Sequence, residues 1–469
     1  MNNRLAFLTC ASILLLGACG GTSAPAGSGP ASAPPSAVAS VATTSGAAAS
    51  STSALGSTVS SGSASSPSRS AAAGEKGPIK IGIVMPMSGP AAQLGKDNTD
   101  GFNLALAAVN NTVAGRNIDV IIEDTQGKPD VAVTKAQKLS QSDKVNIIAG
   151  FNFTAECYAL GPVIRDLQQP SVVSGNCSAL HLLTDAKYKS PYLIRTSQTT
   201  ITFDSAGHSA GKLGSKKAVI LAQDGLNEAV DTFSRAFVSD GGQILQETYT
   251  TLGTNDYGPY VSQLDPQADT IALFETGIDG LRFGQALQSY GLVGKYKIFD
   301  NVGGMVNGQN RAQLKDAAVG AYGGGMYCEC LDTPQNQAFL KVWNAKYPGR
   351  TLSTDVAQGY SGAQVILAAL QKINGNVEDK QALLNALYAT DVETIKGPIK
   401  LDQDHDVIEN NYLSQVTKQA DSYPLKLIET SQLLSKYDLP PDVLQKFPFG
   451  QMKGKWVGMT KDKLADYTK

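Results

Sequence analysis

Histidine is scarce in this chain of 469 residues: there are three, His181, His208 and His405, and they are far apart in the sequence. Enzymes that use a serine or cysteine nucleophile, or a metal ion, usually place histidines or other basic groups next to the reacting atom. None of the three falls in a predicted loop close to a plausible nucleophile. We therefore expect no catalytic centre, no metal site and no other cofactor.

Long apolar runs and an excess of positive charge are also missing. After the N-terminal segment, no stretch is apolar enough to cross a bilayer, which takes about 20 apolar residues. The 39 Lys and Arg residues are balanced by 41 Asp and Glu residues, giving a formal net charge of −2. Proteins that bind nucleic acid are usually basic. The sequence thus argues against nucleic acid as a partner.

The N-terminus has the features of an export signal. Arg4 precedes an uncharged apolar run from Leu5 to Leu16, which ends in Leu16-Gly17-Ala18-Cys19. The run is too short to span a membrane stably and has the length of a secretory signal core. Its last four residues resemble the lipobox of bacterial lipoproteins, which implies cleavage before Cys19 and a lipid anchor on it. The alternative is an ordinary signal peptide that happens to contain a cysteine.

The segment after Cys19 has the composition of a tether. From Gly20 to Gly74 it consists almost wholly of Ala, Ser, Gly, Thr, Pro and Val, and Arg69 is its one charged residue. Such a segment cannot bury enough apolar surface to offset the entropy lost on ordering. We expect a disordered linker with a reach of about 40 Å.

The remaining sequence alternates between strand and helix patterns. It opens with the apolar run 79–86, and an apolar stripe at helical spacing follows at Phe102, Ala105, Leu106 and Val109. Further strands are predicted at 118–123, 145–149, 171–174, 218–222, 244–249, 270–274, 296–299 and 318–322. Helices are predicted between them, for example at 131–140, 157–167, 279–290, 336–347 and 355–373. This alternation predicts an α/β fold with parallel sheets flanked by helices, and the length favours two similar lobes.

At several places in order, the chain resembles the leucine/isoleucine/valine-binding protein family, which has the type I periplasmic-binding fold. The similar segments are 79–110, 256–261, 276–279, 359–365 and 397–399. The resemblance implies two lobes joined by three hinge crossovers, with a solute cleft between them that closes on binding. The crossovers are placed near Ile201, Met326 and Lys396. It also implies an extracytoplasmic protein, held at the cell membrane by a lipid on Cys19, whose partner is an ABC permease.

The expected organisation follows from the leader, the linker and this resemblance. It comprises a signal peptide at 1–18, the lipidated cysteine and linker at 19–76, a first lobe at 77–201 plus 327–396, a second lobe at 202–326 plus 397–430, and a C-terminal extension at 431–469.

The four cysteines beyond the leader are expected to form disulfides. An even number of cysteines in an exported chain favours disulfides over metal ligands, although the Cys328-Glu329-Cys330 spacing could hold a soft metal. Cys157 and Cys177 follow neighbouring strands of one predicted parallel sheet, where Cα atoms approach to about 5–6 Å. We predict that these two pair. Cys328 and Cys330 are then left to each other or reduced.

Loops at the carboxyl ends of the predicted strands should face the cleft. The candidate ligand-binding residues in these loops are Ser88, Gln93, Thr154, Glu156, Asn176, Cys177, Ser178, Asn227, Thr276, Gly277, Asp300 and Asn301. By the resemblance, Thr154, Asn176 and Ser178 would hold a solute carboxylate, although loop hydroxyls are also common helix caps. Glu156 favours a neutral or cationic solute if it enters the cleft, and otherwise it is a solvated acid at a helix start.

The second lobe departs from the family pattern. Leu226-Asn227 and Gly277-Ile278 stand where amino-acid binders of the family usually have aromatic residues. Asp300-Asn301 stands near the usual acid, so an ammonium clamp requires Asp300 or Glu275 to turn inward. The expected solute is an amino acid or a similar small polar molecule, with an amide, a short peptide or an aromatic acid left open. The alternatives to transport are a receptor domain that signals to a membrane sensor and, less favoured, an exported enzyme.

Two motifs invite other interpretations. Asp402, Asp404 and Asp406 alternate like the start of a calcium-binding loop, but the glycine and the closing glutamate of such a loop are absent. We expect a polar turn between strands. The Gly359-Tyr360-Ser361-Gly362 motif is similar to a nucleophile elbow, but its second glycine is one residue early and its context is helical.

Overall fold

The computed structural model describes residues 76–197 and 200–469. All of these belong to one structural unit. The predicted signal peptide, Cys19 and the linker up to residue 75 lie outside the described residues, so those three predictions stay predictions.

The first sheet has six strands in the order β2-β3-β1-β4-β5-β6. Its strands are β1 (Ile79–Met85), β2 (Thr112–Val113), β3 (Arg116–Asp124), β4 (Ile147–Gly150), β5 (Ser171–Val173) and β6 (Leu193–Arg195). All neighbours are parallel except β2 and β3. β6 was not predicted, because it is short and ends in the charged Arg195, so it does not resemble a buried apolar run.

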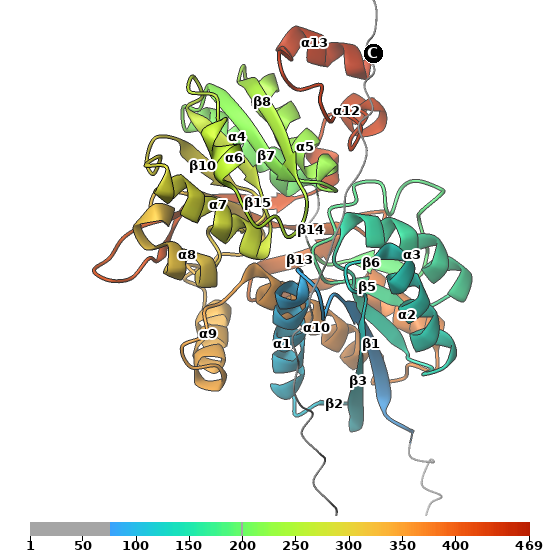
Figure 1. The fold of residues 1–469 in the computed structure, drawn as a ribbon. Helices are drawn as coiled ribbons and strands as arrows, with labels where there is room; N and C mark the ends of the chain where they lie inside the picture. Colours follow the sequence, from blue (N-terminus) through green and yellow to red (C-terminus); the bar gives the residue numbers. More distant parts are fainter. Residues whose placement is uncertain (1–75, 198–199) are drawn as a thin grey trace, which may run out of the picture. The chain divides into compact units, whose positions relative to one another are not determined.

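Helices cover both faces of this sheet (Figure 1). The helices are α1 (Ala92–Ala107), α2 (Pro129–Gln141), α3 (Thr154–Leu167), α10 (Thr354–Lys372) and α11 (Lys380–Tyr388). One buried cluster joins the strands to α1, α10 and α11, and a second joins the opposite side chains to α2 and α3. Phe102, Ala105 and Leu106 of the predicted apolar stripe are buried in the first cluster, whereas Val109 is exposed.

Helices α1 and α10 approach each other closely through two glycines. A Cβ atom on Gly101 would lie 2.0 Å from the carbonyl oxygen of Val356, and one on Gly359 would lie 1.9 Å from that of Asn98. No side chain fits in so small a gap. The glycine at position 359 is therefore a packing residue, and the motif around Ser361 lies inside α10.

The second sheet has nine strands in the order β12-β13-β14-β11-β10-β9-β7-β8, with β15 paired to β14. Its strands are β7 (Lys217–Gln223), β8 (Gln243–Thr250), β9 (Thr270–Phe274), β10 (Lys297–Asp300), β11 (Tyr322–Gly325), β12 (Asp391–Thr394), β13 (Gly397–Leu401), β14 (Val407–Val416) and β15 (Leu425–Leu434). β7 to β11 are parallel, and β12 to β15 pair antiparallel. The strand predicted at 318–322 is displaced, because Lys315–Ala318 forms a 3₁₀ turn and β11 begins at Tyr322.

The helices around the second sheet fall into two buried clusters. They are α4 (Ile201–Lys212), α5 (Asn227–Ser239), α6 (Gly258–Ser262), α7 (Gly277–Ser289) and α8 (Gly308–Leu314). Side chains of α4 and α5 pack on one face, and those of α6, α7 and α8 on the other. Helix α9 (Pro334–Lys346) packs instead in a cluster with α10. The α/β fold class with two helix-flanked sheets is thus as predicted.

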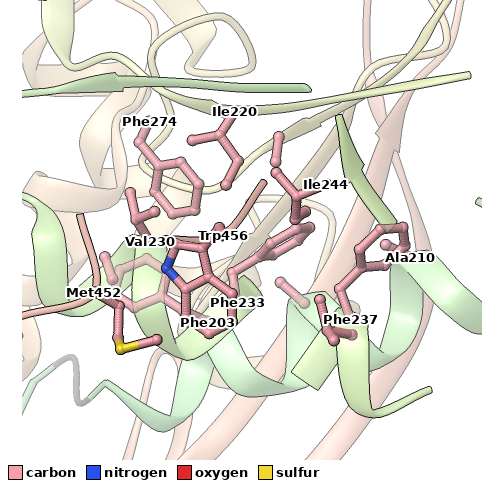
Figure 2. Close-up of a cluster of buried hydrophobic side chains, with 14 of the residues drawn as sticks. Phe203, Ala210, Ile220, Val230, Phe233, Phe237, Ile244, Phe274, Met452 and Trp456 are labelled. Carbon is pink, nitrogen blue, oxygen red and sulfur yellow. The ribbon is translucent and has the colours of Figure 1, made fainter. Parts of the chain in front are cut away.

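The C-terminal segment contributes to the core beside α4 and α5. It contains α12 (Pro441–Lys446) and α13 (Lys461–Ala465), which lie beyond β15. Trp456 is fully buried among the aromatic side chains of Phe203 and Phe233 and beside Met452 (Figure 2). Its indole N–H donates a hydrogen bond to the Asp231 carboxylate at 2.7 Å. This segment is therefore part of the packed core.

The acidic run between β13 and β14 is a strand-to-strand turn, as predicted. The buried ammonium group of Lys436 lies 3.3 Å from Asp402, 2.9 Å from Asp404 and 3.4 Å from Asp406. Asp406 also pairs with the buried guanidinium of Arg195 at 2.6 Å. The three carboxylates thus hold the start of the C-terminal segment against β6.

Candidate functional site

A cleft opens where the amino ends of α1 and α7 and the segments 302–313 and 350–355 come together. It consists of a cavity of about 560 Å³ and a smaller one of about 70 Å³. Both cavities are lined by Val302, Gly303, Asn307 and residues 352–355. The smaller cavity extends to Asn176 and to the loop that follows β11. We call the two cavities together the cleft.

Asp300 shapes one wall of the cleft. It ends β10, is fully buried, and accepts hydrogen bonds from the backbone N–H groups of Gly304 (3.0 Å), Met305 (2.7 Å) and Val306 (2.8 Å). Burial raises the pKa of this carboxyl to about 6. The bonds fold the segment after β10 into a tight loop that places Asn301, Val302 and Gly303 at the cleft.

Asp355 lies in the first turn of α10, buried at the cleft wall. Its Oδ1 atom accepts a hydrogen bond from Nδ2 of Asn176 at 2.5 Å. The Oδ1 of Asn176 in turn accepts a hydrogen bond from Nε2 of Gln358 at 2.6 Å, which fixes the orientation of the amide. Burial, and then the nearby Asp97, raise the pKa of Asp355 to about 8.

Asp97 of α1 stands on the adjoining wall and is fully engaged. It accepts hydrogen bonds from Gln93 Nε2 at 2.7 Å and from Ser353 Oγ at 2.6 Å, and it pairs with Arg350. Arg350 also binds Asp100 at 2.6 Å. This network ties the segment before α10 to the side of α1.

Arg311, the second arginine of the cleft, also has internal partners. Arg311 of α8 pairs with Glu329. Its remaining guanidinium N–H groups donate to the backbone carbonyls of Tyr423 and Val306, each at 2.8 Å. Both cations that line the cleft thus already have carboxylate partners.

Beside the cleft, direct hydrogen bonds join the helices of the two sheets. Glu228, at the start of α5, is buried and accepts hydrogen bonds from the hydroxyl of Tyr158 on α3 and from the backbone N–H of Leu180 at 3.0 Å. Burial raises the pKa of Glu228. These bonds close the region between the loops that follow β5 and β7.

Proteins of a known family share this architecture. The family model of periplasmic binding proteins matches residues 78–421. The chain belongs to this family. A Leu/Ile/Val-binding protein homolog of Brucella melitensis is 28% identical over 373 residues, which cover 77% of this chain and 94% of the relative. The family implies an extracytoplasmic location.

Two solved structures of the periplasmic binding protein fold extend the likeness. An ABC transporter substrate-binding protein from Sphaerobacter thermophilus is 30% identical, with a TM-score of 0.70, and covers 76% of this chain and 98% of its own. A solute-binding protein of an ABC transporter from Rhodopseudomonas palustris, in complex with 3,4-dihydroxybenzoic acid, is 27% identical, with a TM-score of 0.71 and the same coverage of both chains. These relatives are solute-binding proteins of ABC transporters.

Four of the predicted site residues of this periplasmic binding protein line the cleft: Gln93, Asn176, Gly277 and Asn301. Asn176 and Asn301, in the loops after β5 and β10, line the smaller cavity. Gln93, in the first turn of α1, and Gly277, the first residue of α7, line the larger one. Whether they contact a solute stays a prediction.

The other eight predicted residues do not line these cavities, and several have internal partners. The hydroxyl of Ser88 donates to Asp124, and that of Thr276 donates to Gln223 at 2.6 Å. Glu156 is buried and accepts a hydrogen bond from the N–H of Phe153 at 3.3 Å. Thr154 starts α3, Asn227 starts α5, and Ser178 and Asp300 are buried. Glu275, the alternative ammonium clamp, accepts hydrogen bonds from Thr250 and Tyr257.

Cys177 is joined to Cys157, the pairing that the sequence predicted, and Cys328 is joined to Cys330. The first bond ties the loop after β5 to α3. Cys328 lies on the cleft wall, so the second bond shapes the loop after β11.

Asp97, Asp355 and Arg350, the ion-pair partner of Asp97, were not predicted from the sequence, and neither were Arg311 and Glu329. Asp97 stands in the middle of α1 and Asp355 opens α10, so neither follows a strand. Each acid stands four residues before a glycine of the close helix contact, Gly101 or Gly359, but this spacing alone does not indicate a cleft.

Within residues 76–197 and 200–469, none of the helices is long and apolar enough to cross a bilayer. In the same ranges, no three or more histidine, cysteine or acidic side chains cluster in a way that could hold a metal ion.

Proposed function

We propose that this protein captures a small polar organic solute in the cleft and presents it to an ABC permease. The observation that carries the proposal is a cavity of about 560 Å³ lined by segments that follow β1, β9 and β10, which adjoins a smaller cavity reached by the loop after β5. A space of this size suits a small organic molecule. The relatives from Sphaerobacter and Rhodopseudomonas are binding proteins of ABC transporters, which supports a permease as the partner.

The proposed mechanism is hinge closure between two lobes, 77–201 plus 327–396 and 202–326 plus 397–430, with 431–469 attached to the second. The contact between Tyr158 and Glu228 supports closure, because it joins helices that pack on different sheets. Closure would bury the solute and create the shape that the permease recognises. The solute would be released unchanged, without catalysis by the protein.

The lipid anchor is part of the same proposal. A lipidated Cys19 would keep the protein at the outer surface of the cell membrane, and the linker would allow it to reach the permease. The lipobox-like Leu16-Gly17-Ala18-Cys19 supports this anchor.

A thermal-shift screen of the purified 77–469 fragment tests the function. The solutes are the common amino acids, short amides, urea, polyamines and simple aromatic acids. A solute at about 100 times its dissociation constant adds about 2.7 kcal/mol to the stability of the fold. We expect one narrow class to raise the melting temperature and to reduce the radius of gyration in X-ray scattering. Turnover of the solute, or binding without compaction, would contradict the proposal.

Three alanine variants locate the solute. Asn176→Ala removes a side chain of the cleft and should weaken binding, whereas Asn385→Ala, on the exposed face of α11, should not. Thr154→Ala tests the predicted carboxylate loop. If it alone weakens binding, the solute sits at the loop after β4 and outside the cleft.

A further inference from the structure

The cleft is lined by more acidic than basic side chains. Among the described residues, the charged side chains that line it are Asp97, Arg311, Glu329, Arg350 and Asp355. Arg350 pairs with Asp97 and Arg311 pairs with Glu329. Asp355 remains, and within the described ranges it makes no ion pair. The side chain that orients it belongs to Asn176, which is neutral.

This arrangement is unfavourable for an anionic solute. A carboxylate in the cleft would find both guanidinium groups engaged and would lie close to the carboxylates of Asp97, Glu329 and Asp355. To pair with Arg350 it would have to displace the buried Asp97, which would leave that carboxylate unpaired, and to pair with Arg311 it would have to displace Glu329. A cationic group would instead stabilise the ionised form of Asp355, the carboxylate of the cleft that has no cationic partner.

The hydrogen bond from Asn176 to Asp355 also favours a cationic solute. The amide of Asn176 donates its N–H to Asp355, and Gln358 prevents the amide from turning over by donating to its oxygen. A donor aimed at a carboxylate favours the ionised form, as does a position in the first turn of a helix. The ionised carboxylate of Asp355 can thus accept hydrogen bonds from a solute.

We infer that Asp355 is the specificity-determining residue of the cleft and that it receives a cationic nitrogen of the solute, so that the protein binds amines or amino acids in preference to simple organic acids. The inference rests on the proposed function and names its class of solute. It separates this chain from the Rhodopseudomonas relative, whose structure contains 3,4-dihydroxybenzoic acid.

Binding of a cation should release a proton. Burial holds the pKa of Asp355 at about 8, so most molecules carry this proton at neutral pH. A cationic nitrogen stabilises the ionised form and expels it. Affinity for an amine should therefore rise as the pH rises towards about 8. The other charged groups that line the cleft are Asp97 with Arg350, and Glu329 with Arg311, and each of these pairs is already formed; Arg350 also binds Asp100.

The experiment uses three probes with one carbon skeleton: leucine, isopentylamine, which lacks the carboxylate, and 4-methylpentanoate, which lacks the amine. Calorimetry is performed on the 77–469 fragment in two buffers with different ionisation enthalpies. We expect leucine or the amine to bind with release of nearly one proton at neutral pH, and the acid not to bind. Asp355→Asn should weaken binding at least tenfold and abolish the proton release.

Asp166→Asn is the matched control, because it makes the same chemical change at an exposed site on α3. Circular dichroism and melting of unliganded Asp355→Asn show whether it folds, and the proton release of the wild type tests the inference without any variant. Binding of the acid alone, with affinity falling as the pH rises, overturns the inference: Asp355 would then donate its proton to a carboxylate. The proposed function would survive that outcome. A failure of every solute in the wider screen would overturn both.

Discussion

The hydroxyl of Tyr158 donates a hydrogen bond to the carboxylate of Glu228, and this bond connects a helix of the first sheet to a helix of the second. The two residues are 70 positions apart in the sequence. The backbone N–H of Leu180 supplies the second donor to the same carboxylate. Because Glu228 is buried, each donor matters for the stability of this arrangement.

Tyr158→Phe should therefore favour an open form. The change leaves a buried carboxylate with one donor fewer, at a cost of about 1–3 kcal/mol. We expect a larger radius of gyration without solute and a weaker affinity for it. Tyr290→Phe, on an exposed tyrosine, is the control. An unchanged radius and affinity in Tyr158→Phe would show that this bond does not hold the two sheets together.

Loss of the Cys157–Cys177 bond should lower stability substantially. The bond joins residues 20 positions apart, and closing a loop of this size adds about 3 kcal/mol. The double variant Cys157→Ala, Cys177→Ala should melt at a clearly lower temperature. The Cys328–Cys330 bond spans two positions, so its double alanine variant should lose less. Non-reducing peptide mapping that links either pair to the other would refute the pairing.

Trp456→Ala should destabilise the protein by about 3–5 kcal/mol, because it empties a large volume in a packed core. The neighbouring Val457 is 55% exposed, so Val457→Ala should change the free energy of unfolding by less than about 0.5 kcal/mol. Denaturant unfolding measures both. Equal effects would mean that the C-terminal segment does not contribute to the core.

The stability that His208 provides should depend on pH. Hydrogen bonds to Asp204 and Asp240 raise its pKa, so the folded state favours the protonated form. This contribution is fully present below the ordinary pKa of histidine and disappears as the pH rises through the raised value. His208→Gln should therefore cost more stability at about pH 5.5 than at about pH 8.5.

His181 supplies a control of opposite sign. Burial lowers its pKa, so the folded state favours the neutral form and its charging destabilises the protein in acid. His181→Gln should cost less stability at low pH than at high pH. The same pH trend in both variants would show that local contacts do not govern these histidines.

Cys19→Ser should prevent lipidation and leave either an unprocessed precursor or a soluble protein. Cell fractionation with mass spectrometry of the N-terminus distinguishes these states. Cys10→Ser, within the leader, should leave the anchor intact. A correctly trimmed chain that remains on the membrane without lipid would disprove the lipobox interpretation.

Much of the fold could be predicted because its strands are short buried apolar runs bounded by turns. The run 79–86 and the strand Thr270–Phe274 are examples. β6 was not predicted because it is short and contains Arg195, a charged residue that is buried only because it pairs with Asp406. The strand expected at 318–322 began later, because the small residues before Tyr322 turn instead of extending.

The site was harder to predict than the fold. Asn176 and Asn301 could be found because they follow strands, where polar loops converge. Asp300 follows a strand as well, but the backbone donors of its own loop occupy its carboxylate. Asp97 and Asp355 were missed because they come together through packing of helices that are far apart in the sequence, and no local pattern reports such a contact.

The two glycines between α1 and α10 have a consequence for how solute preference can change. Gly101 touches the carbonyl of Val356, which follows Asp355, and Gly359 touches the carbonyl of Asn98, which follows Asp97. Widening this contact, for example with Gly359→Ala, would move the two acids relative to each other and alter the electric field that a solute meets. Natural selection or engineering can thus change the solute preference of this protein through Gly101 and Gly359, which do not line the cleft.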